Sequence, residues 1–168
     1  MTAPSTTHRF VALDVFTDQV FAGNRLAVVW DADDLDDATM GAIAREFDFS
    51  ETVFLQSPTA AGCDVRTRIF TPGRELPFAG HPTIGTAVAL GREGAGPSLR
   101  FDQGAGPLDV EVGEGSARFT VEREVAVAER GEVAAEWLAP LLGLAVDDLP
   151  MGGRTASAGT PFMVVEVA

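Results

Sequence analysis

The sequence contains no lysine and no tyrosine, and among its 168 residues it has one cysteine and two histidines. Without lysine the chain cannot form a lysine Schiff base, anchor pyridoxal phosphate or supply the lysine of a phosphate-binding P-loop. Without tyrosine it has no phenolic acid. Because Cys63 is alone, no disulfide, Cys-x-x-Cys redox pair or two-thiol mechanism can form within one chain. With only two histidines, a histidine-rich zinc site is not expected.

Positive charge is scarce as well, since 12 arginines face 25 acidic residues and the net charge is −13. Proteins that bind nucleic acid by neutralising phosphates need clustered positive charge, so we expect no nucleic-acid partner. We interpret the acidic run between Asp31 and Asp37 as a solvated helix entry rather than a metal site, because no histidine lies near it in the sequence.

Long apolar runs are also missing. No stretch approaches the roughly 20 residues that a membrane span needs. The short polar segment at residues 1–9 has no apolar core of the kind found in a secretory signal. We therefore expect a soluble, cytoplasmic protein that does not bind membranes, with one domain or one domain plus part of another.

Hydrophobic patterns in the first 124 residues predict an α+β domain. A helix beginning at Asp36 or Asp37 and ending near Phe47 shows helical spacing of its apolar residues. Strands are predicted where apolar runs or alternation occur. They fall at residues 9–16, 26–30, 50–55 and 63–70, with three further pieces within 99–121 that include a hairpin of 108–112 with 117–121.

A second helix, at residues 82–92, is predicted to be the centre of this domain. Pro82 suits the first position of a helix, and the residues after it form no charged face. Such a helix must be surrounded by protein, and Gly85, Ala87 and Ala89 would let a sheet approach closely. We therefore expect a curved mixed or antiparallel sheet wrapped around this helix.

The composition changes to charged and small residues at 122–131, where we place a boundary between domains 1–124 and 125–168. The second part predicts a one-faced helix at 133–142, a turn at 151–153 and a strand at 162–167. So few elements rarely form a core alone. They either pack on the first domain or begin a second domain that is incomplete.

The segment Phe78-Ala79-Gly80-His81-Pro82-Thr83 places a histidine at the start of the central helix. The helix N-terminus disfavours a second positive charge, so the pKa of His81 should tend downward. A neutral imidazole can act as a base or donate a hydrogen bond to an oxyanion, and the free N–H groups of the first turn can hold a carboxylate. A capping or packing histidine is the structural alternative.

Three other polar residues have both a functional and a structural interpretation. Desolvation beside a buried strand would suit Glu51 to proton transfer, whereas a solvent-facing glutamate at a strand end would have no such role. Asp14 interrupts an apolar strand and needs hydrogen-bond partners if it is buried. Asn24 follows Gly23 and fits a turn. From the residues alone, the structural interpretation is favoured for all three.

Six segments in order resemble the PhzF family of phenazine-biosynthesis isomerases. They are Asp14-Val15-Phe16-Thr17, Phe21-Ala22-Gly23-Asn24, Leu26-Ala27-Val28-Val29, Ser50-Glu51-Thr52-Val53-Phe54, Phe70-Thr71-Pro72 and Phe78-Ala79-Gly80-His81-Pro82-Thr83. A weaker match, Ser157-Ala158-Gly159-Thr160-Pro161-Phe162, resembles the opening strand of that family's second domain. The resemblance implies the fold of diaminopimelate epimerase, with two similar domains and the active site between them.

The resemblance also implies an activity: a cofactor-independent isomerase that moves a proton on a small, carboxylate-bearing substrate such as dihydro-hydroxyanthranilate. Glu51 would be the acid/base and His81 would assist. Substrate contacts would come from Asn24, Ser50, Gly80, Pro82 and Thr83, with no metal and no cofactor, in a homodimer.

Two features depart from the family pattern. Arg25 stands where the family usually has proline, and the second-domain Gly-Asp-Pro segment that supplies an aspartate is absent. Ala79 occupies the place of the first thiol of the related epimerases, which argues against thiol chemistry. The alternative hypothesis is therefore a truncated, non-catalytic half-protein or a binding and dimerisation module of the same fold.

Overall fold

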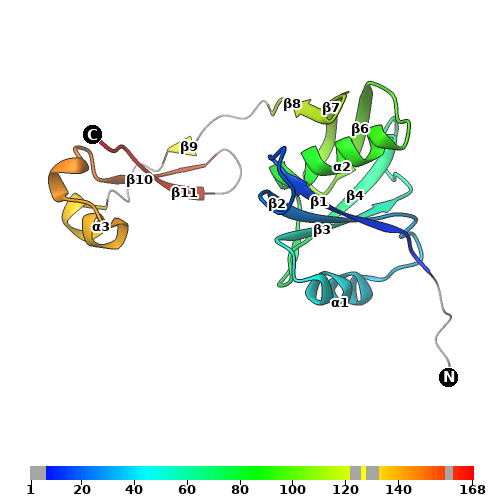
Figure 1. Cartoon of the computed structure of the whole chain (residues 1–168), viewed down its shortest axis with the longest axis horizontal. Helices are drawn as coiled ribbons and strands as arrows, with labels where there is room; N and C mark the ends of the chain where they lie inside the picture. The colour runs from blue at the N-terminus through cyan, green and yellow to red at the C-terminus, as the bar shows by residue number, and fades with distance from the viewer. Residues whose placement is uncertain (1–6, 122–125, 128–132, 158–160) are drawn as a thin grey trace. The chain divides into compact units, whose positions relative to one another are not determined.

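The computed structural model describes residues 7–121, 126–127, 133–157 and 161–168, shown in Figure 1. It divides into two compact units, Met1–Thr120 and Val121–Ala168, which are described separately. The larger unit contains an eight-stranded sheet and two helices. Its elements are β1 (Phe10–Val15), β2 (Asn24–Val29), α1 (Asp37–Phe47), β3 (Glu51–Gln56), β4 (Val65–Phe70), β5 (Glu75–Leu76), α2 (Gly80–Arg92), β6 (Ser98–Gln103), β7 (Gly106–Gly113) and β8 (Ser116–Phe119).

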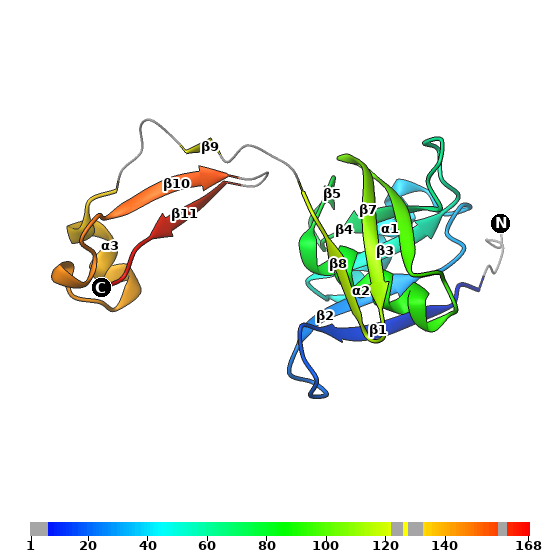
Figure 2. The ribbon, with the colours of Figure 1, turned by 90° about the horizontal axis from the view of Figure 1, so that it is seen from above.

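The sheet is mixed, and its strand order is β1-β2-β3-β4-β6-β7-β8, with β5 paired to β4. Its pairs are antiparallel except β2 with β3 and β4 with β6. The sheet curves around α2, which lies between the β1–β2 hairpin and the β7–β8 hairpin in Figure 2. The predicted α+β fold with a central helix is confirmed.

Helix α2 begins at Gly80, two residues before the predicted start, so Pro82 is its third residue rather than its first. Proline is tolerated there because the first N–H groups of a helix have no partner within the helix. The predicted close approach of the sheet is visible at Gly85. A Cβ atom on this residue would lie 2.5 Å from Leu26 Cδ2 and 2.7 Å from Val15 Cγ2.

The core occupies both faces of the sheet, because the central strand β3 is buried on both sides. Val53 and Leu55 face the cluster that includes Ala89 of α2. Phe54 faces the other cluster, with Phe70 and Met40 of α1. The apolar run of β3 therefore fixes the position of this strand, and Glu51 is its first residue.

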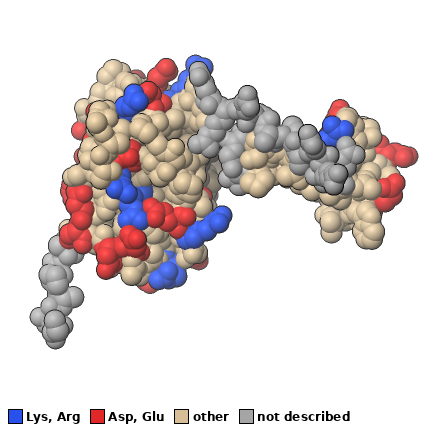
Figure 3. Space-filling model, turned by 180° about the vertical axis from the view of Figure 1, so that it is seen from behind, with Lys and Arg blue, Asp and Glu red and all other residues tan. Residues whose placement is uncertain are grey.

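Helix α1 has the predicted N-terminus, since the Asp36 carboxylate accepts a hydrogen bond from the Thr39 N–H at 2.8 Å. Asp48 closes the helix in a left-handed conformation with φ 50°. On the surface, Arg68 lies against both Asp37 of α1 and Glu75, at 2.7 and 2.6 Å. On the face shown in Figure 3, arginine side chains lie among the acidic ones and partly offset their negative charge.

The smaller unit contains α3 (Ala135–Leu142), a 3₁₀ turn at Val146–Asp148 and a three-stranded antiparallel sheet. The strands are β9 (Ala126–Val127), β10 (Gly153–Ser157) and β11 (Pro161–Val165). Strand β10 was not predicted from the sequence. It starts directly after the turn at Gly152, which has φ 63°, and the glycines there favoured a turn over a strand.

The one-faced helix predicted at 133–142 begins only at Ala135, and only part of its apolar face is buried. Leu138 and Ala139 are buried, but Trp137 is 76% exposed and Leu141 is 82% exposed. These two exposed side chains are four residues apart and so share a face of the helix. Among the described residues, no helix is long and apolar enough to cross a membrane.

Candidate active site

Three elements of the larger unit bring predicted site residues together at the start of α2. Asn24 is the first residue of β2, Glu51 is the first of β3, and His81 is the second of α2. The parallel register of β2 and β3 pairs Leu26 with Glu51, so both strands start at the same edge of the sheet. The first turn of α2 lies against both strand ends, since His81 contacts Asn24 and Glu51.

The side chains form a short hydrogen-bonded chain. Ser50 Oγ donates to Asn24 Oδ1 at 2.8 Å, and Asn24 Nδ2 lies 3.2 Å from His81 Nδ1. Glu51 Oε2 lies 3.2 Å from the same ring nitrogen. The side chains of His81 and Glu51 are only 9% and 17% exposed, so the pair is largely shielded from water.

Burial lowers the pKa of His81 below its ordinary value of 6.5. The Glu51 carboxylate and a hydrogen bond with the Arg25 backbone act in the opposite direction, and burial outweighs both. The predicted downward direction is confirmed, but the largest cause is desolvation rather than the helix N-terminus. The ring is therefore neutral at physiological pH.

This lowered pKa predicts a pH dependence of stability. The unfolded histidine takes up a proton near pH 6.5, whereas the folded one resists protonation. The stabilisation from His81 is thus complete above about pH 6.5 and is lost as the pH falls through the folded-state pKa. Urea unfolding of His81→Asn should show a shallower loss of stability below pH 6.5 than the unchanged chain. Identical curves for the two proteins would contradict the assignment.

Two polar atoms of the pair have no hydrogen-bond partner within the described part of the chain. Glu51 Oε2 and His81 Nε2 are both buried, and neither forms a hydrogen bond of ordinary geometry. Unpaired buried polar atoms are costly and are concentrated at functional sites. A carboxylate oxygen without an internal donor can accept a proton, and a ring N–H without an acceptor can donate to a ligand.

The other predicted contact residues lie in the first turn of α2, but the side chain of Thr83 is engaged internally. Thr83 is 1% exposed, and its hydroxyl donates to the Ala79 carbonyl at 2.8 Å. The same hydroxyl accepts a hydrogen bond at 3.0 Å from Gln103, a buried residue that the sequence did not single out. Gly80 and Pro82 lie in the same turn, and no side chain caps the N-terminus of the helix. Substrate contacts by these three residues remain a prediction.

Gln103 is the last residue of β6, and no local sequence pattern marks its role. Its side-chain amide also donates to Thr67 at 3.1 Å, which ties α2 to β4. Asp14, by contrast, has the structural role that the sequence favoured. Its carboxylate accepts a hydrogen bond from the Phe21 N–H at 2.9 Å and closes the loop after β1.

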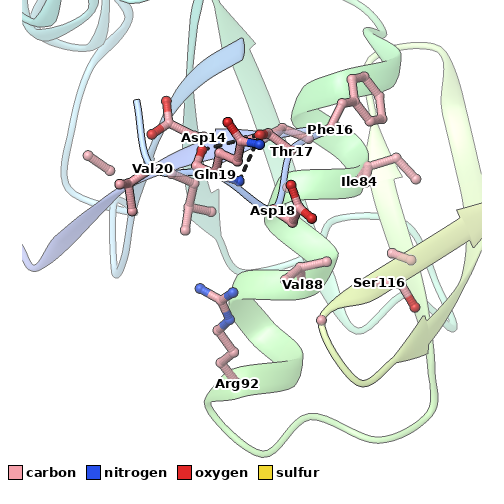
Figure 4. Close-up of a pocket in the computed structure, with 16 residues that line it drawn as sticks. Asp14, Phe16, Thr17, Asp18, Gln19, Val20, Ile84, Val88, Arg92 and Ser116 are labelled. Atoms are coloured by element: carbon pink, nitrogen blue, oxygen red, sulfur yellow. Dashed lines mark hydrogen bonds between the residues drawn. The ribbon is translucent and has the colours of Figure 1, made fainter. Parts of the chain in front are cut away.

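A separate cavity of about 510 Å³ lies along α2 beyond the first turn, and its lining includes neither Glu51 nor His81. Figure 4 shows Ile84, Val88 and Arg92 along the helix, between the loop after β1 and Ser116 at the tip of the β7–β8 hairpin. The cavity therefore follows the gap between the two edge strands. In the part of the chain that the structure describes, no group of three or more His, Cys, Asp or Glu side chains could hold a metal ion.

Comparison with known proteins identifies a family. The family model described as phenazine biosynthesis-like protein, PhzC-PhzF, matches residues 13–168. An uncharacterised isomerase of Mesorhizobium japonicum is 38% identical over 172 residues, which cover 96% of this chain and 57% of the relative. The trans-2,3-dihydro-3-hydroxyanthranilate isomerase of Pseudomonas aeruginosa is 51% identical over 86 residues, which cover 51% of this chain and 31% of that enzyme.

The fold matches a solved structure of the same kind. A PhzF-family phenazine biosynthesis protein of Bacillus anthracis superposes with a TM-score of 0.82 at 31% sequence identity. The match covers 97% of this chain and 57% of the Bacillus protein. The chain thus spans less than two thirds of the length of these relatives.

Proposed function

The chain belongs to the phenazine biosynthesis-like PhzC-PhzF family, and on that premise we propose that it carries the proton-transfer residues of an isomerase site. Glu51 is the acid/base and His81 is its partner. The substrate is a small molecule with a carboxylate, of the dihydro-hydroxyanthranilate type named for a relative. The pair of unpartnered buried atoms, Glu51 Oε2 and His81 Nε2, is the observation that carries the proposal.

The reaction is a proton shift that balances within the substrate. Glu51 takes a proton from one carbon as the C–H bond breaks, and the electron pair spreads through the neighbouring unsaturated system. The Nε2–H of His81 and the first-turn N–H groups of Gly80 and His81 stabilise the charge that develops. Glu51 then returns the proton to another carbon. Substrate and product are isomers, so no oxidant or reductant is consumed.

The substrate class is tested by comparing trans-2,3-dihydro-3-hydroxyanthranilate with its methyl ester. We expect the 168-residue chain to isomerise the free acid, followed by proton NMR, and to act on the ester at least about tenfold more slowly. The loss follows because the ester lacks the charge that the helix N-terminus holds. Equal rates for acid and ester would contradict a carboxylate-bearing substrate.

A second candidate role, as a dimerisation module, is favoured by the apolar surface of the smaller unit. Trp137 and Leu141 on α3 are largely exposed, and so is Phe162 on β11, at 67%. Exposed apolar surface of this kind is typical of an interaction site. We propose a homodimer that buries it, and this role is compatible with the isomerase.

The dimer proposal predicts the effect of changing one aromatic side chain. Trp137→Ser should weaken self-association by about 2 kcal/mol, roughly 30-fold in Kd, because buried tryptophans are frequent hot spots of interfaces. Sedimentation equilibrium over a range of concentrations measures the change. Glu136→Gln, a neighbouring exposed position, is the matched control. A monomeric unchanged chain, or equal Kd values for Trp137→Ser and the control, would contradict the proposal.

A further inference from the structure

The amide of Asn24 has a defined orientation in the site. Ser50 Oγ can only donate to Asn24 Oδ1, because a carbonyl oxygen has no proton to give. The other end of the amide, the Nδ2 amino group, therefore faces His81 Nδ1 at 3.2 Å. An NH₂ group is a donor, so the ring nitrogen opposite it must accept.

This orientation decides which ring nitrogen carries the proton. In a neutral imidazole one nitrogen donates and the other accepts, and the partner of one nitrogen sets the state of the other. We propose that Asn24, oriented by Ser50, holds the proton of His81 on Nε2 and so keeps the Glu51 carboxylate free of an internal donor. The tautomer follows from this orientation of the Asn24 amide, whereas its meaning for catalysis rests on the proposed function.

The unpaired state of Glu51 agrees with this tautomer. Glu51 Oε2 lies 3.2 Å from Nδ1, but not in a direction that gives a hydrogen bond of ordinary geometry with that nitrogen. Oε2 has no hydrogen-bond partner among the described residues. An N–H on Nδ1 would present its positive end to the nearby carboxylate and weaken it as a base. With Asn24 on Nδ1, the carboxylate keeps its capacity to accept a proton from a substrate.

Besides Glu51, no charged side chain in the part of the chain that the structure describes acts on the pKa of the ring. Strand β2 contributes Asn24 and the backbone of Arg25, and β3 contributes Glu51. The first turn of α2 has no acidic residue. The guanidinium of Arg25 lies over the ring of Phe49, 5.0 Å from its centre. Asn24 is therefore a positioning residue for His81 rather than a second base.

The tautomer is measured on the ¹⁵N-labelled 168-residue chain, without substrate, by long-range ¹⁵N–¹H NMR near pH 8, where His81 is neutral because burial lowers its pKa below the ordinary value of 6.5. We expect His81 to carry its proton on Nε2. Asn24→Asp replaces the donor with an acceptor of the same shape, so it should move the proton to Nδ1 and raise the pKa of His81. Ser50→Ala, which frees the amide to turn, should shift the tautomer in the same direction to a smaller extent. His8, the only other histidine, is the internal control.

Each outcome decides the proposal. An Nδ1–H tautomer in the unchanged chain would mean that the Asn24 amide faces the other way, and would overturn it. So would an unchanged tautomer in Asn24→Asp. If Asn24→Asp does not fold, the tautomer of the unchanged chain still decides.

Measuring turnover tests the proposed function separately from the tautomer. A positioning role predicts that Asn24→Asp lowers kcat at least about tenfold with little change in KM, because a wrong tautomer disables the site without removing binding. If the tautomer moves as expected and kcat does not fall, the hydrogen-bond inference stands. In that case the proposed role of Glu51 as the free base is the part that fails.

Discussion

Glu51→Gln is expected to fold normally and to lose turnover by about 10²- to 10⁴-fold, the usual contribution of a general acid/base. The amide has nearly the shape of the carboxylate but cannot take a proton from carbon. Because Glu51 Oε2 has no hydrogen-bond partner within the described residues, the change removes no internal hydrogen bond at that atom. The measurement is kcat for the isomerisation, with circular dichroism to confirm that the variant is folded.

Glu46→Gln provides the matched control for this change. Glu46 lies on α1, outside the site, and its side chain is exposed to solvent. It undergoes the same chemical substitution and the same loss of one negative charge, and we expect it to keep normal turnover. Glu51→Asp, which retains the carboxylate on a shorter side chain, should recover part of the lost activity. Near-normal turnover in Glu51→Gln would mean that another residue moves the proton.

The largest expected effect on stability comes from Phe54→Ala. Phe54 is fully buried in the middle of β3, and its ring packs edge-on against Phe70 with the ring centres 5.5 Å apart. Its removal leaves a cavity between the sheet and α1, so the free energy of unfolding should fall by about 3–5 kcal/mol. Urea unfolding monitored by circular dichroism measures this change.

Phe21→Ala is the control for Phe54→Ala. Phe21 is 94% exposed in the loop after β1, so the same truncation removes almost no buried area. We expect a change within about 0.5 kcal/mol, as for surface positions in general. Similar losses for the two variants would show that β3 is not the centre of the core, and the support of Glu51 by that strand would need another explanation.

The central helix and its sheet could be predicted because their signals are local and mutually consistent. An apolar helix with small residues such as Gly85 requires a surrounding sheet, and the alternation at residues 63–70 predicts a strand of that sheet. The helix start was wrong by two residues, because the preference of proline for the first position is a tendency and Gly80 enters the helix earlier. Boundaries depend on backbone geometry that composition does not determine.

The candidate site could be predicted in part. A histidine at a helix start and a glutamate before a strand are recognisable, and the family resemblance linked them. Their actual contact, through Nδ1 and the amide of Asn24, depends on which strand ends meet across the sheet. The role of Gln103 depends equally on tertiary packing, since Thr67 and Thr83 are 36 and 20 residues away from it in the sequence. Such pairings carry no local sequence signal.

The smaller unit was the least predictable part. Its helix was expected to bury one face, yet Trp137 and Leu141 are exposed. Amphipathic spacing shows which side chains share a face but does not identify what covers that face. The missed strand β10 begins at Gly153, directly after a glycine turn, where propensity favours a loop.

The central claim is that Glu51 moves a proton on the substrate, and solvent exchange tests it most directly. The unchanged chain and Glu51→Gln are incubated side by side in D₂O with trans-2,3-dihydro-3-hydroxyanthranilate, and deuterium at the substrate carbons is followed by NMR. We predict that the unchanged chain introduces deuterium, because the carboxyl proton exchanges with solvent between the two steps, and that Glu51→Gln introduces almost none. Equal deuterium uptake with both proteins would contradict the account.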